Sequence, residues 1–322
     1  MTSRPTRSAT AAALVGALTL IGASACGGSP GQAGADGRIA VVASTNVWAS
    51  VARAVGGDAV SVTAILSDPG ADPHGYEAKP ADAVAFDNVK VVLSNGGGYD
   101  DFFTGLADTA GANARKIVAF ELAGKGDSGG QHQSSEPVPN EAAHEPAVNE
   151  HVWYDLDTVH RVADKLVDEL SAVAPDKRDV FRTNAATFAH GLDDIAAKAA
   201  GIGRAKPGAK VVATEPVAAY LLATAGLSDA TPEEFSEAIE EESDPSAAAV
   251  AKTDALVTDK EVAVVVYNSQ TETPVTKQLK DKAVAAGVPV VGVTETLPPG
   301  ATDYLAWMTT QVDDLARAVA AA

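Results

Sequence analysis

The sequence contains one cysteine among 322 residues, and aromatic side chains make up only 5% of it. A single cysteine excludes an intramolecular disulfide, so disulfides do not hold this fold. The scarcity of aromatics predicts cores built from valine, alanine, leucine and isoleucine. With 46% hydrophobic residues, the composition is that of a globular protein, and the length predicts about two domains.

Basic residues are also scarce, with 24 Lys and Arg against 43 Asp and Glu and a formal net charge of −19. A nucleic-acid-binding protein needs clustered Lys and Arg to neutralise phosphates, so we expect no nucleic-acid partner. The acidic excess is compatible with a cation ligand, although acidity by itself indicates only solubility.

The N-terminus resembles a bacterial lipoprotein leader. Arg4 and Arg7 precede an apolar stretch (9–21) that is too short for a well-anchored membrane span, and "ASAC" ends at Cys26. We therefore predict a signal peptide over residues 1–25. The resemblance to a lipobox implies acylation of the Cys26 thiol and a tether to the outer face of the cytoplasmic membrane. An ordinary signal peptide with an incidental cysteine is the alternative. Residues 26–37 have the composition of a flexible linker.

Valine-rich runs alternate with helical patterns in the first half of the body. Strands are predicted at 38–44, 59–66, 89–94 and 116–120, and helices at 47–55, 80–87 and 99–107. Such alternation predicts a mostly parallel sheet covered on both faces, here an N-terminal lobe over 38–175. Residues 124–150 have almost no apolar side chains and are predicted to be a long mobile loop within that lobe.

A second series of the same kind follows two helices predicted at 157–172 and 176–200. Its strands are predicted at 209–214, 262–268 and 288–293, and its helices at 216–225, 274–286 and 302–320. The predicted fold class is α/β. Two similar lobes, each a mostly parallel sheet flanked by helices, are joined by one long helix. The linking helix is assigned to 176–203 and the C-terminal lobe to 204–322.

In open α/β sheets, ligands bind outside the carboxyl ends of the strands. Four side chains of this sequence lie at such places, just after a strand or just before a helix. His74 follows the 59–66 strand, and His151 precedes the 157–172 helix. Glu215 and Glu295 come just after the 209–214 and 288–293 strands. Two imidazoles and two carboxylates suit a divalent first-row metal.

Each of these four residues also has an ordinary interpretation. His74 could be a solvated turn residue, and His151 could pack at a helix start. Glu215 could be a first-turn acid stabilised by the helix dipole, and Glu295 could cap or solvate a loop. Spacing alone does not choose between the two interpretations.

Five segments, in order from about residue 38 to the C-terminus, resemble the zinc/manganese ABC-transporter substrate-binding lipoproteins. They are "DPHGYEAKPAD", "SNGGGYDDFFTGL", "NEHVWYDLDTV", "VVATEPVAAYLLATAGL" and "VVGVTETLPPGATDYLAWM". The resemblance implies His74, His151, Glu215 and Glu295 as metal ligands between the two lobes. It also implies a rigid long helix with small motions on binding, and delivery of the metal to an ABC permease that has a cytoplasmic ATPase. We expect a monomer that is lipid-anchored on the extracytoplasmic face of the cell membrane.

The sequence departs from the family pattern at three places. Asn149-Glu150 replaces the usual Asp-Pro before His151, Glu215 is of the manganese type, and Glu295 stands where aspartate is commoner. Mixed N/O ligands favour Mn²⁺ slightly, while Zn²⁺ binds more tightly at almost any such site.

Two other functions have to be weighed. A secreted metallohydrolase could use the same ligands, but the sequence lacks an HExxH motif, a nucleophile elbow and a P-loop. A surface adhesin of the same family would not explain four convergent ligands.

Overall fold

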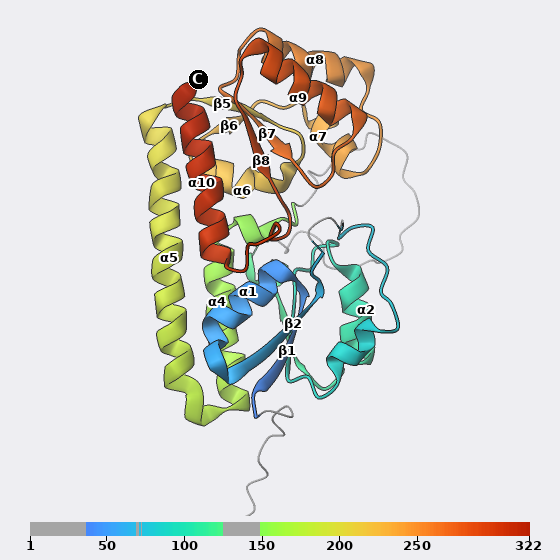
Figure 1. Ribbon diagram of the computed structural model, residues 1–322, viewed down its shortest axis with the longest axis vertical. Helices are drawn as coiled ribbons and strands as arrows, with labels where there is room; N and C mark the ends of the chain where they lie inside the picture. Colours follow the sequence, from blue (N-terminus) through green and yellow to red (C-terminus); the bar gives the residue numbers. More distant parts are fainter. Residues whose placement is uncertain (1–36, 69–70, 72, 125–148) are drawn as a thin grey trace, which may run out of the picture. The chain divides into compact units, whose positions relative to one another are not determined.

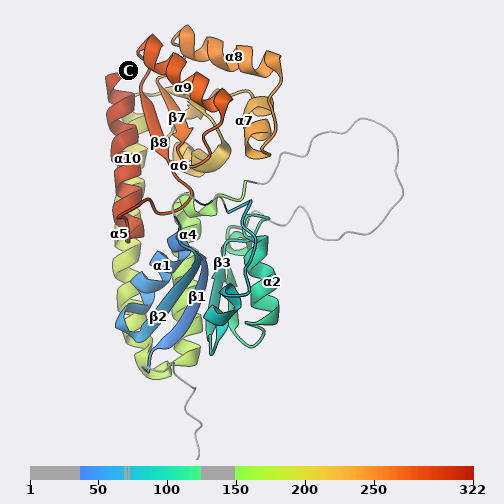
Figure 2. The same ribbon diagram turned by 45° about the vertical axis from the view of Figure 1, so that its right-hand side comes forward.

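The computed structural model describes residues 37–68, 71, 73–124 and 149–322 (Figures 1 and 2). The predicted signal peptide (1–25), the acylation site at Cys26, nearly all of the linker (26–37) and most of the predicted loop (124–150) lie outside these residues.

The first lobe is built on a parallel sheet with strand order β2-β1-β3-β4. Its strands are β1 (Ile39–Thr45), β2 (Val60–Leu66), β3 (Val91–Ser94) and β4 (Arg115–Val118). Alternate residues face opposite layers. Val41 and Val91 pack in the same core as α1 (Asn46–Gly56), whereas Val42 and Val92 pack with α2 (Asp101–Thr109). Both faces are thus covered, which explains the continuous apolar runs.

The second lobe repeats this arrangement with strand order β6-β5-β7-β8, again parallel. Its strands are β5 (Lys210–Ala213), β6 (Ser228–Asp229), β7 (Val264–Asn268) and β8 (Val290–Val293). Helices α7 (Glu233–Glu240), α8 (Ala247–Thr258) and α9 (Pro274–Ala286) pack on one face. The other face packs with α6 (Ala219–Thr224) and α10 (Tyr304–Ala321).

One long helix, α5 (Arg178–Ala205), has 28 residues and runs beside both lobes (Figure 1). At 1.5 Å per residue it is about 42 Å long. It follows α4 (Leu156–Val173) and packs against α1, α4, α6 and α10. One hydrophobic cluster includes side chains from both sheets and from these helices. The predicted fold class, two α/β lobes joined by a long helix, is confirmed.

Local elements differ from the predictions at a few places. The helix predicted at 80–87 is a short 3-10 helix (Asp82–Phe86), and the strand predicted at 116–120 ends at Val118, before α3 (Ala119–Leu122). The helix predicted at 216–225 begins as a 3-10 turn. Residues 226–261, for which no element was predicted, form β6, α7 and α8. Further 3-10 turns are Gly57–Ala59, Val152–Tyr154 and Pro175–Lys177.

Hydrogen bonds join the two lobes beside the carboxyl ends of the strands. Asn46 donates from Nδ2 to the Leu297 carbonyl at 3.2 Å and accepts from the Leu297 N–H at 2.9 Å. The Tyr304 hydroxyl donates to the Trp153 carbonyl at 2.6 Å. These bonds, together with the common core, fix the lobes near the predicted ligands.

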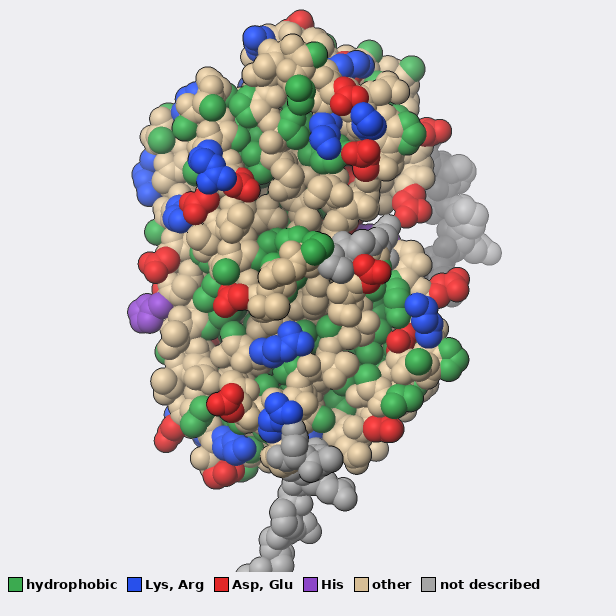
Figure 3. Space-filling model, in the orientation of Figure 1, with side chains coloured by type: hydrophobic (Ala, Val, Ile, Leu, Met, Phe, Trp, Pro, Cys, Tyr) green, Lys and Arg blue, Asp and Glu red, His purple; other side chains and the backbone are tan. Residues whose placement is uncertain are grey.

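Acidic and basic side chains are interspersed on the face seen in Figure 3, which has no large basic area. Within the part of the chain that the structure describes, no helix combines the length and apolar character needed to cross a membrane.

Candidate metal centre

His74 lies in the loop after β2, and its side chain is 29% exposed. The Tyr99 ring packs edge-on against the imidazole with ring centroids 5.1 Å apart. The centroid of the His151 ring lies 6.3 Å from that of His74. The loop therefore brings the first predicted histidine next to the second.

His151 is fully buried just before α4, and Asn149 sets its tautomer. The Asn149 amide donates from Nδ2 to the Pro216 carbonyl at 2.9 Å, so its Oδ1 is the end that faces His151. That oxygen accepts from the His151 backbone N–H at 2.9 Å and lies 2.8 Å from His151 Nδ1. Since Oδ1 can only accept, Nδ1 carries the hydrogen and Nε2 presents its lone pair.

The pKa of His151 is lowered to about 3, mainly because burial disfavours the charged imidazolium and further because of the neighbouring His74. The ring is therefore neutral near pH 7. A neutral imidazole with its other nitrogen hydrogen-bonded is the form that binds metals.

The glycine-rich segment after β3 positions the backbone next to His151. Asp100 accepts from the backbone N–H groups of Asn95 at 2.6 Å and Gly96 at 2.8 Å, and Asn95 Nδ2 donates to the Glu150 carbonyl at 2.9 Å. At Gly97, φ is +73° and a Cβ would lie 2.8 Å from the Phe120 ring and 3.2 Å from the Glu150 Cβ, so any larger residue would be strained there. Burial raises the pKa of Asp100.

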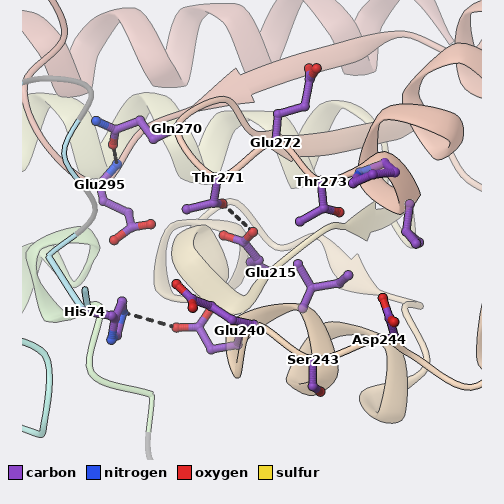
Figure 4. A pocket seen from close by; sticks show the side chains of 14 residues that line it. His74, Glu215, Glu240, Ser243, Asp244, Gln270, Thr271, Glu272, Thr273 and Glu295 are labelled. Atoms are coloured by element: carbon purple, nitrogen blue, oxygen red, sulfur yellow. Dashed lines mark hydrogen bonds and ion pairs between the residues drawn. The ribbon is translucent and has the colours of Figure 1, made fainter.

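Glu215 and Glu295 are both buried, at 5% and 3% exposure, and they share one donor. Asn268 Nδ2 donates to Glu215 Oε2 and, at 2.8 Å, to Glu295 Oε1. The Thr271 hydroxyl donates to the other Glu215 oxygen (Figure 4). The Glu295 backbone N–H donates to Gln270 Oε1 at 2.5 Å. The two predicted carboxylates thus converge, as the strand-end argument requires.

The two histidines, however, contact a different pair of carboxylates. Ligand atoms of His74, Glu150, His151 and Glu240 all lie within 4.8 Å of one another. Glu240 Oε1 is 3.6 Å from His74 Nε2 and 3.4 Å from His151 Nε2. Glu150 Oε1 is 3.8 Å from His74 Nε2, and burial raises the pKa of Glu150.

One pocket of about 410 Å³ connects the two groups of side chains. His74, Glu215, Glu240 and Glu295 all line it, from both lobes (Figure 4). Among the described residues that line it there is no Lys or Arg. A pocket with imidazole and carboxylate ligands and no basic side chain is suited to a divalent cation.

Glu150, Glu240 and Asn268 were not predicted as residues of this site. Asn268 ends β7 and could have been found by the strand-end rule that found Glu215 and Glu295. Glu240 ends α7, whose Phe235 and Ile239 are both buried at i, i+4 spacing. That spacing was a signal for the helix, but no local signal marks its last residue as facing a pocket.

Comparisons with known proteins identify the family of this chain. Residues 41–318 match the family described as "Zinc-uptake complex component A periplasmic". The chain belongs to this family. It is a family of transporter substrate-binding proteins and not of enzymes, so the metallohydrolase alternative does not hold.

Curated relatives match over about half of the chain. The manganese-binding lipoprotein MntA of Bacillus subtilis is 26% identical over 182 residues, covering 56% of this chain and 55% of MntA. The zinc-binding lipoprotein AdcA of Streptococcus pneumoniae is 25% identical over 180 residues, covering 54% of this chain and 35% of AdcA. The matched region thus spans about half of one relative and a third of the other.

Solved structures share the fold over most of their length. The periplasmic zinc-binding protein TroA from Treponema pallidum has a TM-score of 0.70 at 19% identity, covering 88% of this chain and 99% of TroA. The binding protein FpvC from Pseudomonas aeruginosa, solved in complex with Mn²⁺, has a TM-score of 0.66 at 20% identity. It covers 88% of this chain and 98% of FpvC.

Proposed function

We propose that this protein is the extracytoplasmic solute-binding component of an ABC importer for a divalent transition metal, either Mn²⁺ or Zn²⁺. The observation that carries the proposal is the pocket between the lobes. His74 and several carboxylates line it, His151 lies beside His74 near Glu240, and no Lys or Arg is among its described lining residues. Metal-binding lipoproteins among the relatives support the same function.

In this proposal the captured ion is held by His74, His151, Glu215 and Glu295. Its water shell is released as the four side chains replace it. Asn149 keeps the Nε2 lone pair of His151 available, and Asn268 holds the two carboxylates together. Carboxylate oxygens and neutral imidazoles suit Mn²⁺ and Zn²⁺ alike, and the oxygen-rich set favours Mn²⁺ when zinc is scarce.

The proposal includes a location and a partner. Acylation at Cys26 would tether the protein to the outer face of the cell membrane, and the linker would let the body reach a permease. The permease would take the ion, and a cytoplasmic ATPase would power import. The lipoproteins among the relatives support this arrangement.

Isothermal titration of the full-length protein in detergent with Mn²⁺ and with Zn²⁺ tests the function. We expect tight one-to-one binding of both metals at neutral pH and no comparable heat with Mg²⁺. His74→Ala and Glu215→Gln should each weaken binding by more than about 100-fold, because loss of an outer-shell partner already costs 10- to 100-fold. His160→Ala, at an exposed histidine on α4, is the control. Weak binding of both metals by the unaltered protein would contradict the proposal.

A further inference from the structure

Glu240 places one carboxylate oxygen between the two imidazoles of the site. Its Oε1 lies 3.4 Å from His151 Nε2 and 3.6 Å from His74 Nε2. Two atoms that each bind a tetrahedral ion at 2.0–2.1 Å are about 3.3 Å apart, which follows from the bond length and the tetrahedral angle. The distances from Oε1 to the two imidazole nitrogens are therefore close to the spacing of ligands around one ion.

The tautomer of His151 shows which of its nitrogens is available to an ion. Asn149 fixes the hydrogen on Nδ1, so His151 Nε2 presents a lone pair, and this fully buried atom makes no hydrogen bond. It faces Glu240 Oε1, which as a carboxylate oxygen also carries lone pairs. A cation between these two atoms would make a favourable contact with a lone pair of each.

The end of α7 adds negative charge at the same place. Glu240 is the last residue of the helix, Glu241 and Glu242 follow it, and no basic residue occupies the last turn. Carbonyl groups at the C-terminus of a helix carry a partial negative charge, which disfavours carboxylates and favours cations. These acidic residues destabilise the C-terminus of α7 when no cation is present, and they attract a positive ion.

Glu215 and Glu295 lie in the same pocket but are engaged elsewhere. Both accept from Asn268, and Glu215 also accepts from Thr271. They are not in the group of four residues whose ligand atoms lie within 4.8 Å of one another. His74 thus lines the same pocket as Glu215 and Glu295, while both histidines lie close to Glu240 and Glu150.

We propose that Glu240, with Glu150, forms a transit site in which the entering ion is first bound by the two histidines and is then passed to Glu215 and Glu295. The inference rests on the proposed capture of a divalent metal. The histidines remain bound while one carboxylate pair replaces the other. Glu240 is then a residue that sets the rate of capture and release rather than the final affinity.

Metal-binding kinetics of the full-length protein in detergent test this proposal. The Trp153 ring centroid lies 5.0 Å from that of His151, so tryptophan fluorescence in a stopped-flow instrument reports Mn²⁺ binding. For Glu240→Gln we expect the association and dissociation rate constants to fall together by at least about tenfold, the scale on which groups near a metal act. The equilibrium Kd, measured by titration, should change little.

Three variants give the comparison. Glu234→Gln removes the same charge from an exposed residue in the first turn of α7 and should leave both rate constants near those of the unaltered protein. Glu240→Asp keeps the charge but withdraws the carboxylate, and should slow both rates as Glu240→Gln does. Glu215→Gln should raise Kd mainly through faster dissociation.

Two results would overturn the inference while leaving the proposed function intact. A higher Kd for Glu240→Gln, caused by faster dissociation at an unchanged association rate, would make Glu240 a permanent ligand. Rate constants for Glu240→Gln equal to those of Glu234→Gln would give Glu240 no part in binding. If the unaltered protein binds neither Mn²⁺ nor Zn²⁺ tightly, the proposed function itself fails, and the transit site with it.

Discussion

The Oδ1 atom of Asn149 lies 2.8 Å from Nδ1 of His151 and also accepts the backbone N–H of the same histidine. One side chain, two residues before the histidine, thus orients a buried imidazole. Asn149 gives His151 the kind of hydrogen-bonded support that metal-binding imidazoles have.

Asn149→Ala should weaken Mn²⁺ and Zn²⁺ binding by about 10- to 100-fold, because the imidazole loses the partner that fixes its tautomer and orientation. Titration calorimetry at neutral pH measures the change. Asn149→Asp retains an acceptor for Nδ1 and should bind more tightly than the alanine variant. Equal Kd values for Asn149→Ala and the unaltered protein would show that the hydrogen bond is not needed.

Asn268→Ala should destabilise the metal-free protein by about 1–3 kcal/mol or more, since two buried carboxylates lose their common donor. The free energy of unfolding in urea, measured with a chelator present, gives this value. Added Mn²⁺ should recover part of the loss, because the ion neutralises the same carboxylates. Asn268→Asp, which has the same size but adds a carboxylate, should lose more stability than the alanine variant. The reverse order would argue against charge repulsion as the cause.

Tyr304→Phe should lower the free energy of unfolding by about 1–3 kcal/mol, because the buried Trp153 carbonyl loses its donor. Thermal or urea unfolding measures the loss, and metal affinity should change little since neither group faces the pocket. Tyr76→Phe is a suitable control. Its hydroxyl bonds the Asp82 carboxylate, which is only partly buried, so water can replace the bond. A loss of metal affinity without a loss of stability would contradict this interpretation.

The buried carboxyl of Asp100 should make stability depend on pH. Burial raises its pKa in the folded protein. Between the unfolded pKa and the folded pKa, the folded state therefore binds more protons than the unfolded state. Its favourable contribution is complete below the unfolded pKa of about 3.8 and is lost as pH rises through the folded pKa.

Comparison with Asp100→Asn isolates this effect, because the amide does not titrate. The stability of the unaltered protein relative to the variant should be greater at pH 4 than at pH 7, measured by urea unfolding with a chelator present. A relative stability that rises with pH would show that the charged carboxylate is the favoured form.

Much of the fold could be predicted from the sequence, because both faces of each sheet are covered and the strands are therefore continuous apolar runs. The valines of β1, β3, β5 and β7 are clear signals for this reason. Helix α7 went unpredicted because Phe235 and Ile239 are surrounded mainly by acidic residues, although their spacing is helical. Helix α8 is rich in alanine, and its apolar residues are not confined to one face, so its sequence has no clear amphipathic pattern. The bounds of the two lobes and of the linking helix stay predictions.

Only the residues of the site that directly follow a strand could be predicted from the positions of the strands. Glu215 and Glu295 follow strands directly, and the structure brings them together. Their role as ligands, with that of His74 and His151, remains a proposal. Glu240 reaches the histidines because α7 packs on its sheet through Phe235 and Ile239, a tertiary contact that no local pattern encodes.

The core that joins both lobes limits which parts of the molecule can move. Separating the lobes would break the Asn46–Leu297 pair and expose apolar surface of α5 and α10, at a high cost in free energy. His74 and the end of α7 line the pocket without belonging to that core. Opening of the pocket therefore needs movement at these two places and not a separation of the lobes.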